Sequence, residues 1–289
     1  IKPFLKWPGG KGKLLPLIES LFPTNIKHYV DPFLGGGSTF LRFAEINGDK
    51  CYYYLNDLNS MIPLSFKIVK ENNEKLSHYL SKLAVDKSKE RYYRVRSSFN
   101  HMNELDADVR CFTSWSTDQT ANLIYLNRTC FNGLYRVNSR DEFNVPYGYY
   151  KNPDTNICDL RINVSALLNN VEVFFSSEDF FSFVDYLVRV KQDKERIFVY
   201  LDPPYEPLVD KQSFTAYTSE GFGREDQERV ASLCEELNRN KILFMLHNSN
   251  TPYINERYSK FNIMQVEAPR SIARTSREPA TEVIIRNYS

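Results

Sequence analysis

Short apolar runs alternate along the chain with segments in which apolar residues recur at helical spacing. The runs are rich in β-branched and aromatic residues, which predicts buried strands. We expect strands at residues 28–33, 51–55, 171–176, 197–202 and 242–248, with a closing pair at 261–268 and 281–288. An amphipathic helix is predicted over residues 224–239. Strands that alternate with helices indicate an α/β sheet with crossover helices.

The middle of the chain has a different pattern. Residues 58 to about 128 show helical periodicity and few strand signals. Residues 127–151 then mix Asn, Gly, Arg and Tyr around a turn at 138–141, which predicts a β-hairpin over about 131–150. The economical arrangement is one sheet domain with an inserted, mainly helical domain that carries the hairpin. The bounds we expect are 1–57 and 155–289 for the sheet domain and 58–154 for the insertion.

Composition and charge narrow the class of protein only modestly. A chain of 289 residues with 42% hydrophobic residues is long and apolar enough for a substantial core. Its formal net charge is +1, so a nucleic-acid partner would have to be held by a local basic face. The 5 cysteines stand far apart without a CxxC pair, which predicts reduced thiols in a cytoplasmic protein. No apolar run approaches the ~20 residues needed to cross a membrane.

The tetrapeptide Asp202-Pro203-Pro204-Tyr205 stands where the predicted strand 197–202 ends. Two consecutive prolines restrict the backbone and donate no N–H groups, so the carbonyls there can face a ligand. Ligands of open α/β sheets bind beyond the carboxyl ends of the strands. Asp202 and the Pro203 carbonyl offer two acceptors and Tyr205 a flat stacking surface, a set that suits an amine on a planar ring. A Pro-Pro turn plugged by an aromatic residue is the purely structural alternative.

A glycine turn at 35–37 follows the first predicted strand, and Ser38 is the expected N-cap of a helix through Ile46. Glycines permit close backbone approach, so a strand, this turn and a helix make a nucleotide-sized pocket. The GxGxxG fingerprint is absent, and tight packing is an equally good interpretation of the turn alone. Asp57 strengthens the pocket, because an acid just past the next strand is placed to grip ribose hydroxyls in such folds.

Two further segments carry groups suited to ligand contact. Lys11 follows a Gly-Gly turn and could meet a carboxylate such as that of S-adenosylmethionine, although a helix start with a solvated lysine is an equal alternative. The predicted hairpin intersperses arginines and asparagines with aromatic residues. Arg and Asn grip guanine and adenine edges, whereas a surface hairpin with solvated arginines is the better interpretation of this segment alone.

Together these motifs, in this order, resemble the Dam family of DNA adenine-N6 methyltransferases in the arrangement called class alpha. The resemblance covers nearly the whole chain. It is carried by FLKWPGGK at 4–11, VDPFLGGGS at 30–38, LNDLN at 55–59, NRTCFNGLYRVNSRDEFNVPYGYYK at 127–151, DPPYEPL at 202–208 and FTAYTSEGF at 214–222.

The resemblance implies a Rossmann-like methyltransferase sheet with an inserted target-recognition domain. It implies transfer of a methyl group from S-adenosylmethionine to N6 of an adenine that is flipped out of duplex DNA. The target it implies is GATC, although related enzymes read longer sites with a similar hairpin. It implies no metal, a bacterial or phage setting in which a restriction enzyme can accompany the methyltransferase, and a monomer or weak dimer.

The resemblance also implies roles for individual residues. The cofactor contacts would be Trp7, Gly9, Lys11, Phe33, Gly35, Asp57, Asp179, Phe180 and Asp202. Catalysis would rest on Asp202, Pro203 and Tyr205. The DNA contacts would be Lys6, Arg128, Phe131, Asn132, Leu134, Arg136, Asn138, Pro146 and Tyr150.

The chain departs from the family pattern at two positions. Tyr149 stands where members often have Arg, and Val209 stands where a hydroxyl is common, so two DNA contacts are in doubt. The arginine-bearing segment 270–278 is a candidate phosphate-binding strap, with a solvated charge run as the alternative.

Two other functions stay open at this point. The acceptor could be RNA or a protein amide, against which the base-reading hairpin argues. The chain could also be a DNA-binding regulator without activity, against which the intact DPPY, Lys11 and Asp57 argue. A hydrolase has no support, because no Ser/His/Asp or metal-ligand pattern is visible among 4 histidines.

Overall fold

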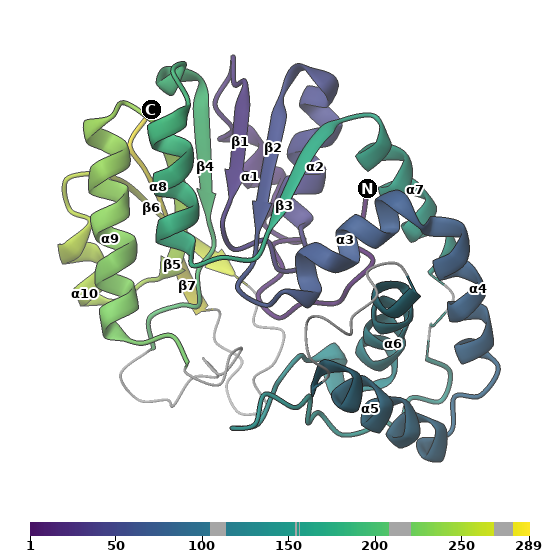
Figure 1. Ribbon diagram of the computed structural model, residues 1–289. Helices are drawn as coiled ribbons and strands as arrows, with labels where there is room; N and C mark the ends of the chain where they lie inside the picture. Colours follow the sequence, from purple (N-terminus) through teal and green to yellow (C-terminus); the bar gives the residue numbers. More distant parts are fainter. Residues whose placement is uncertain (105–113, 154, 156, 208–220, 269–279) are drawn as a thin grey trace.

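The structure is a computed structural model that describes residues 1–104, 114–153, 155, 157–207, 221–268 and 280–289. Its centre is a seven-stranded sheet in the order β3-β2-β1-β4-β5-β7-β6 (Figure 1). β1 to β5 are parallel, whereas β7 runs antiparallel to β5 and to β6. The strands are β1 His28–Asp31, β2 Tyr52–Asn56, β3 Glu172–Ser176, β4 Ile197–Leu201, β5 Leu243–Ser249, β6 Asn262–Ala268 and β7 Ala280–Arg286. The predicted strands and the α/β class are therefore confirmed.

Helices cover both faces of this sheet. Figure 1 shows α8, α9 and α10 over one face, and the apolar core lies in one cluster on each side. The helices that pack on the sheet are α1 Leu15–Ser20, α2 Ser38–Asn47, α7 Cys158–Asn169, α8 Phe180–Val190, α9 Arg224–Arg239 and α10 Pro252–Arg257. Short 3-10 helices span Gly48–Lys50, Phe131–Gly133 and Lys194–Arg196. α9 has the bounds that the sequence predicts.

Burial on both faces explains the sequence pattern of the central strands. In β2, Tyr53 and Leu55 join the core cluster on one face and Tyr54 joins the cluster on the other. In β4 all residues from Ile197 to Leu201 are buried. A strand of a parallel sheet that is covered on both sides therefore appears as an uninterrupted apolar run.

The turn between β1 and α2 differs in detail from its prediction. Gly37, not Ser38, is the N-cap of α2, and Ser38 is the first helical residue. The φ of Gly37 is 71°, in the left-handed region that glycine adopts without strain. A Cβ at this position would lie 2.7 Å from Cζ of Phe66, so close packing as well as backbone conformation favours glycine.

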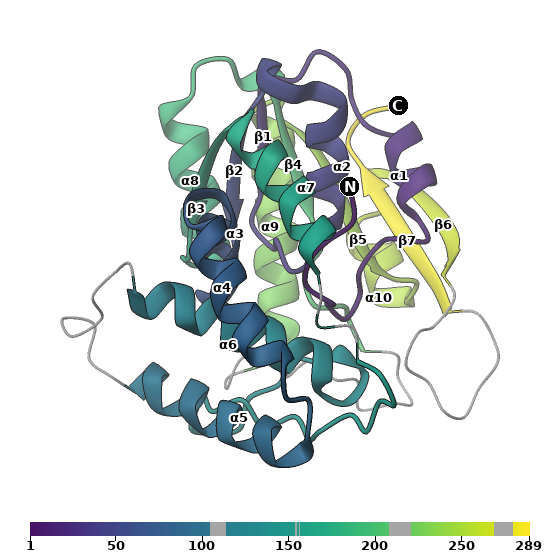
Figure 2. The same cartoon turned by 90° about the vertical axis from the view of Figure 1, so that its right-hand side faces the viewer.

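A helical insertion separates β2 from α7 and β3. Its helices are α3 Met61–Glu71, α4 Asn73–Ala84, α5 Lys89–Glu104 and α6 Ser114–Thr129. In Figure 2, α5 and α6 lie below the helices that cover the sheet. α3 contacts α7 and β3 as well as α6, so it joins the insertion to the sheet layers. The helical character predicted for this stretch is confirmed in the described residues.

The arms of the predicted hairpin lie antiparallel but form no continuous strands in the described residues. Isolated bridges join them, between Cys130 and Tyr147 and between Val137 and Phe143. A 3-10 turn at Phe131–Gly133 interrupts the first arm. Proline and glycine in the second arm, PYG at 146–148, limit ladder pairing there.

The order of the strands predicts a crevice at the centre of the sheet. β2 and β3 extend the sheet on one side of β1, and β4 and β5 extend it on the other. At such a switch point the connections leave neighbouring carboxyl ends in opposite directions, which opens a ligand site between them. Asp31 ends β1 and Asp202 follows β4, so both acids lie at this crevice.

Candidate active site

Lys11 and the DPPY turn meet at the carboxyl end of β4. Lys11 Nζ lies 2.7 Å from Asp202 Oδ1 and donates a hydrogen bond of 2.8 Å to the Gly9 carbonyl. The same ammonium lies 4.9 Å from the centroid of the Tyr205 ring. The exposed fractions of the Lys11 and Asp202 side chains are 5% and 20%, so water screens their attraction far less than at a surface. Residues from the two ends of the chain thus form one unit.

A second acid lies at the far end of the Tyr205 ring. The Tyr205 hydroxyl donates to Glu282 Oε2 at 2.9 Å. Burial raises the pKa of Glu282 and the pKa of Asp202, while the positive charge of Lys11 opposes both rises. Lys11 is therefore the cation that favours the ionised form of either acid.

Asp31 is the most deeply buried acid of the crevice. Its pKa is raised to about 8, mainly by burial and also by the negative charge of Asp202. Hydrogen bonds from the Tyr29 hydroxyl and the Phe33 N–H, at 3.1 and 3.3 Å, oppose this rise. At neutral pH the Asp31 carboxyl is mainly protonated. It therefore adds little negative charge next to Asp202.

The glycine turn folds over Asp57. Gly35 N donates to Asp57 Oδ2 at 2.8 Å, and Asn59 N donates to Oδ1 at 3.0 Å. Burial raises the pKa of Asp57 to about 6, so the carboxylate form predominates at neutral pH. A Cβ at Gly35 would lie 2.7 Å from Cδ1 of Trp7. The turn, the acid and the indole thus form a tight cradle that a side chain at Gly35 would fill.

Aromatic rings continue this cradle toward α8. The ring centroids of Phe33 and Phe180 are 5.1 Å apart, and Phe222 lies 6.1 and 6.3 Å from them. Asp179 is the N-cap of α8, and both of its oxygens lie 2.7 Å from Arg229 Nη2. The Arg229 guanidinium in turn lies 4.7 Å from the Phe180 centroid. Asp179 is therefore engaged by Arg229 at the rim of the cradle.

Asn127 ties the N-terminal segment to the hairpin. Its side chain accepts a hydrogen bond from Lys6 N and donates to the carbonyls of Lys6 and Gly133, at 2.8, 2.8 and 3.0 Å. Trp7, which follows Lys6 in the chain, packs on Tyr135 with ring centroids 5.3 Å apart. The cradle and the hairpin are thus adjoining parts of the molecule.

Most of the residues predicted to contact DNA lie on one accessible stretch. Phe131, Asn132, Pro146 and Lys6 are exposed, and Leu134, Arg136, Asn138 and Tyr150 are partly exposed. Lys6 Nζ lies 5.5 Å from the Tyr150 ring centroid, and Arg136 Nε donates to Asn144 Oδ1 at 2.6 Å.

Arg128 is the exception among these residues. It is buried, and its Nη2 donates to the Phe4 carbonyl at 2.6 Å. In this position Arg128 links the insertion to the N-terminal segment.

Comparison with known proteins identifies the family. The model of the D12 class of N6 adenine-specific DNA methyltransferases matches residues 7–272. The chain belongs to that class. It is 39% identical over 290 residues to the Type II methyltransferase M1.LlaDCHI of Lactococcus lactis subsp. cremoris, covering 100% of this chain and 96% of the relative. It is 38% identical over 304 residues to the Type II methyltransferase M.MjaIII of Methanocaldococcus jannaschii, covering 100% and 99%. The DNA adenine methylase of Escherichia coli K12 is 34% identical over 272 residues, covering 93% and 88%.

This methyltransferase contains site residues that motif analysis missed. Glu282, Arg229 and Phe222 contact predicted site residues from β7, α9 and the segment before α9. Asn127 stands at the start of the segment NRTCFNG, but a lone Asn at a helix end carries no distinctive signal. Glu282 lies opposite Ser249 because β7 pairs with β5. Local sequence patterns do not encode this pairing.

Val209 and the segment 270–278 lie outside the described residues. Within the described ranges, no cluster of His, Cys, Asp and Glu has the makings of a metal site. No helix in the described part of the chain combines the length and apolar character needed to span a membrane.

Proposed function

We propose that this methyltransferase uses S-adenosylmethionine to methylate N6 of an adenine flipped out of duplex DNA, within GATC. The observation that carries the proposal is the Lys11–Asp202–Tyr205 unit at the carboxyl end of β4. Membership of an N6 adenine-specific class supports the base and the atom that is methylated. The GATC target is what the resemblance to the Dam family implies.

The cradle has the chemistry to hold S-adenosylmethionine. Asp57 would accept hydrogen bonds from the ribose hydroxyls, and Phe180 would pack on the adenine. Phe33, whose ring contacts that of Phe180, would lie with Gly35 beneath the methionine end. Trp7, Gly9 and Lys11 would complete the cofactor contacts from the N-terminal segment. Asp179 would lie against the adenine amine. Its two carboxylate oxygens already accept from Arg229, so it would have to share them between the amine and the guanidinium. When bound, the cofactor supplies a methyl group activated by its sulfonium.

The DPPY turn prepares the target amine for attack. Asp202 and the Pro203 carbonyl accept the two N–H groups of the adenine amine and so favour a tetrahedral nitrogen whose lone pair is directed at the methyl group. Tyr205 stacks on the flipped base, which offsets part of the few kcal/mol that unstacking costs. Asp202 needs to hold the amine more than to act as a strong base, because a methylated, cationic amine loses its proton readily.

The insertion is proposed as the target-recognition domain, with bounds near 58–154. Arg136, Asn138 and Asn132 offer side chains that read purine edges, and Leu134 and Pro146 offer apolar contact for a thymine methyl group. The hydrogen bonds of the Asn127 side chain to Lys6 and Gly133, which we call the Asn127 clasp, would keep Lys6 beside them. The likeness to two Type II methyltransferases fits a role beside a restriction enzyme.

The test is transfer of labelled methyl from S-adenosylmethionine to duplex oligonucleotides that differ by single changes within GATC. Label confined to the intact GATC duplex supports the whole proposal. Label at another adenine site retains the chemistry and refutes the target. Label on RNA or a protein amide, with none on any DNA duplex, refutes the DNA acceptor.

The carboxylate has its own test in Asp202→Ala. We expect loss of methyl transfer with specific duplex binding retained, because the acceptor for the amine is removed while the hairpin is unchanged. Glu267→Ala is a matched control, because it removes an exposed acid from the edge strand β6. Loss of specific duplex binding in Asp202→Ala, with binding intact in the control, would count against the assignment.

A further inference from the structure

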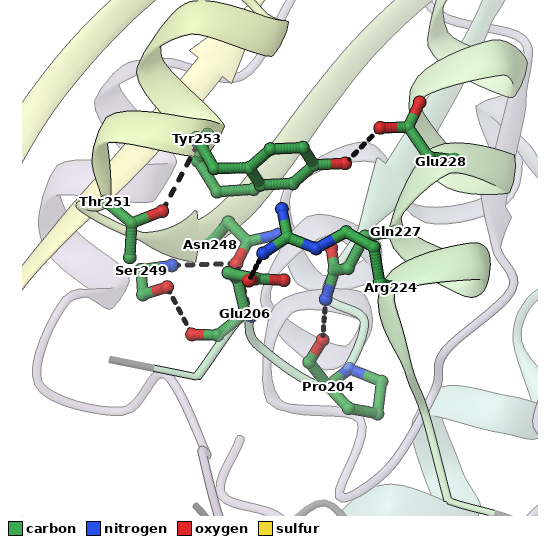
Figure 3. Close-up of polar contacts among 10 residues, drawn as sticks. Pro204, Glu206, Arg224, Gln227, Glu228, Asn248, Ser249, Thr251 and Tyr253 are labelled. Carbon is green, nitrogen blue, oxygen red and sulfur yellow. Dashed lines mark hydrogen bonds and ion pairs between the residues drawn. The ribbon is translucent and has the colours of Figure 1, made fainter. Parts of the chain in front are cut away.

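The backbone after the catalytic turn is held by a pair of buried amide side chains (Figure 3). Gln227, on the first turn of α9, donates from Nε2 to the Pro204 carbonyl at 2.8 Å. Asn248, near the end of β5, donates from Nδ2 to Gln227 Oε1 at 3.0 Å. The two amides thus form a chain from the sheet to the carbonyl of the second proline.

Asn248 also holds the next peptide. Its Oδ1 accepts from Glu206 N and Ser249 N, both at 2.9 Å. The Ser249 hydroxyl donates to the Glu206 carbonyl at 2.6 Å. Both backbone groups of Glu206 are therefore fixed to the end of β5, one residue after Tyr205.

Burial restricts each of the two amide side chains to one orientation. Gln227 is 1% exposed and Asn248 is 0% exposed, so water does not replace a lost partner. Turning either amide over would place its oxygen against an acceptor or its NH2 against a donor. Each amide therefore has one orientation that satisfies all of the contacts, and the Pro204 peptide has one orientation with it.

The prolines explain why side chains are needed here. Pro203 and Pro204 have no N–H, so two backbone donors that could hold the turn are missing. Gln227 takes the Pro204 carbonyl, which separates that group from the Pro203 carbonyl assigned to the target amine. An error of about 1 Å in the turn would cost about a hundredfold in rate for a reaction that depends on alignment.

A charged layer covers the amide pair. Arg224, the first residue of α9, forms an ion pair with Glu206 and lies 3.6 Å from the centroid of the Tyr253 ring. The Tyr253 hydroxyl donates to Glu228, further along α9. The first turns of α9, which carry Gln227, are thus tied to the residue that Asn248 also holds.

We propose that Gln227 and Asn248 are positioning residues that align the DPPY turn for methyl transfer. They touch neither substrate and act through the Pro204 and Glu206 peptides. The proposal rests on the proposed function, because alignment matters only if Asp202, Pro203 and Tyr205 hold the acceptor.

Gln227→Glu tests the donor. An ionised Glu has no hydrogen to offer the Pro204 carbonyl, whereas a protonated Glu can donate to it and still accept from Asn248. We expect the single-turnover methylation rate to fall tenfold to a hundredfold, as alignment is lost. The ratio of the variant rate to the wild-type rate should then recover as the pH is lowered from about 8.5 to about 6.

Two further variants separate alignment from general damage. Gln227→Met fills the space without a donor, so its rate should fall at every pH with no recovery. Gln119→Glu makes the same chemical change at a buried amide of α6, where Nε2 donates to the Phe99 carbonyl at 2.9 Å, far from the turn. Gln227→Glu and Gln227→Met should both bind S-adenosylmethionine and duplex DNA within about threefold of wild type. A Gln227→Glu rate that shows no recovery, or that matches the loss in Gln119→Glu, overturns the proposal.

Hydrogen exchange supplies a readout that needs no acceptor. In residues 202–207 the prolines have no amide, so a peptide of this span reports on few N–H groups, including Glu206. Asn248→Ala should speed exchange there, because the Oδ1 acceptor of Glu206 N is removed. Unchanged exchange refutes the clamp. Exchange could also become faster in Asn248→Ala although the wild-type enzyme methylates no DNA. In that case the hydrogen bonds of Gln227 and Asn248 hold the turn, and the proposed function is wrong.

Discussion

Gly35→Ala probes the cradle with one added methyl group. The added Cβ would lie 2.7 Å from Cδ1 and 3.0 Å from Nε1 of Trp7. The residue would also keep a φ of 48°, a left-handed conformation that L-residues rarely adopt. The Gly35 N–H that Asp57 accepts is retained, so the change acts through shape and backbone strain instead of through a lost hydrogen bond.

The magnitude follows from these two terms. The left-handed conformation costs roughly 1–2 kcal/mol for a residue with a Cβ. Moving the Trp7 indole out of contact adds about 1–3 kcal/mol, the usual range for overpacking. We therefore expect the free energy of unfolding to fall by about 2–5 kcal/mol. Because the displaced indole lines the cradle, the affinity for S-adenosylmethionine should fall at least about tenfold, or ~1.4 kcal/mol.

The assay combines urea unfolding with calorimetric titration of S-adenosylmethionine at a temperature where every variant is folded. Gly48→Ala is the control. Gly48 has a φ of 55°, but no atom lies within 4 Å of the position that its Cβ would occupy. It caps the opposite end of α2, so its replacement strains the backbone of the same helix without touching the cradle.

Both variants should lose stability, and only Gly35→Ala should lose cofactor affinity. A Gly35→Ala protein that binds S-adenosylmethionine within about twofold of wild type would refute the reasoning, because the indole and the turn would then not shape the site. Equal losses of affinity in both variants would also refute it, since the loss would follow from destabilised α2.

Three further predictions concern single groups. Because the pKa of Asp57 is about 6, wild-type affinity for S-adenosylmethionine should weaken as the pH falls from about 7.5 to about 5, and Asp57→Asn should bind weakly at both values; a wild-type affinity that ignores pH contradicts this. Asp31 binds a proton more tightly in the folded chain (pKa about 8) than in the unfolded one (pKa about 4), so its contribution to stability declines as the pH rises between these values. Asp31→Asn should therefore gain stability relative to wild type between about pH 5 and about pH 8.5 in urea unfolding, and a constant difference would be the failing result. Arg136→Ala should reduce the discrimination between the cognate duplex and a duplex with one altered base by about 1–3 kcal/mol, measured as the ratio of their single-turnover methylation rates, while the affinity for S-adenosylmethionine is unchanged. If the wild-type enzyme methylates both duplexes equally, Arg136 has no base to read and the prediction fails.

Much of the sheet could be predicted because its strands are covered on both faces. β4 is an apolar run with no polar interruption, and the prolines that follow Asp202 mark its end unambiguously. α9 has a buried face at regular helical spacing, and its first residue follows Gly223. Local pattern and tertiary environment agree in these elements, so local reasoning was sufficient.

The rest depends on contacts between distant segments. Ser38 has the chemistry of an N-cap, but the left-handed turn and the proximity of Phe66 put Gly37 there. Arg128 looks like a cation for DNA, and only the fold reveals that the Phe4 carbonyl lies beside it. Glu282 reaches Tyr205 because β7 pairs with β5, a pairing that no local pattern encodes.

The Asn127 clasp has a thermodynamic consequence. Lys6, which Asn127 holds beside the hairpin, and Trp7, which packs on the glycine turn, are joined by one peptide bond. A ligand that moved one of these residues would act on the other through that bond. By reciprocity, any free energy with which duplex DNA changes affinity for the cofactor must equal the free energy with which the cofactor changes affinity for duplex DNA. With DNA at Lys6 and the cofactor at Trp7, as proposed, this short covalent segment would link the two binding equilibria.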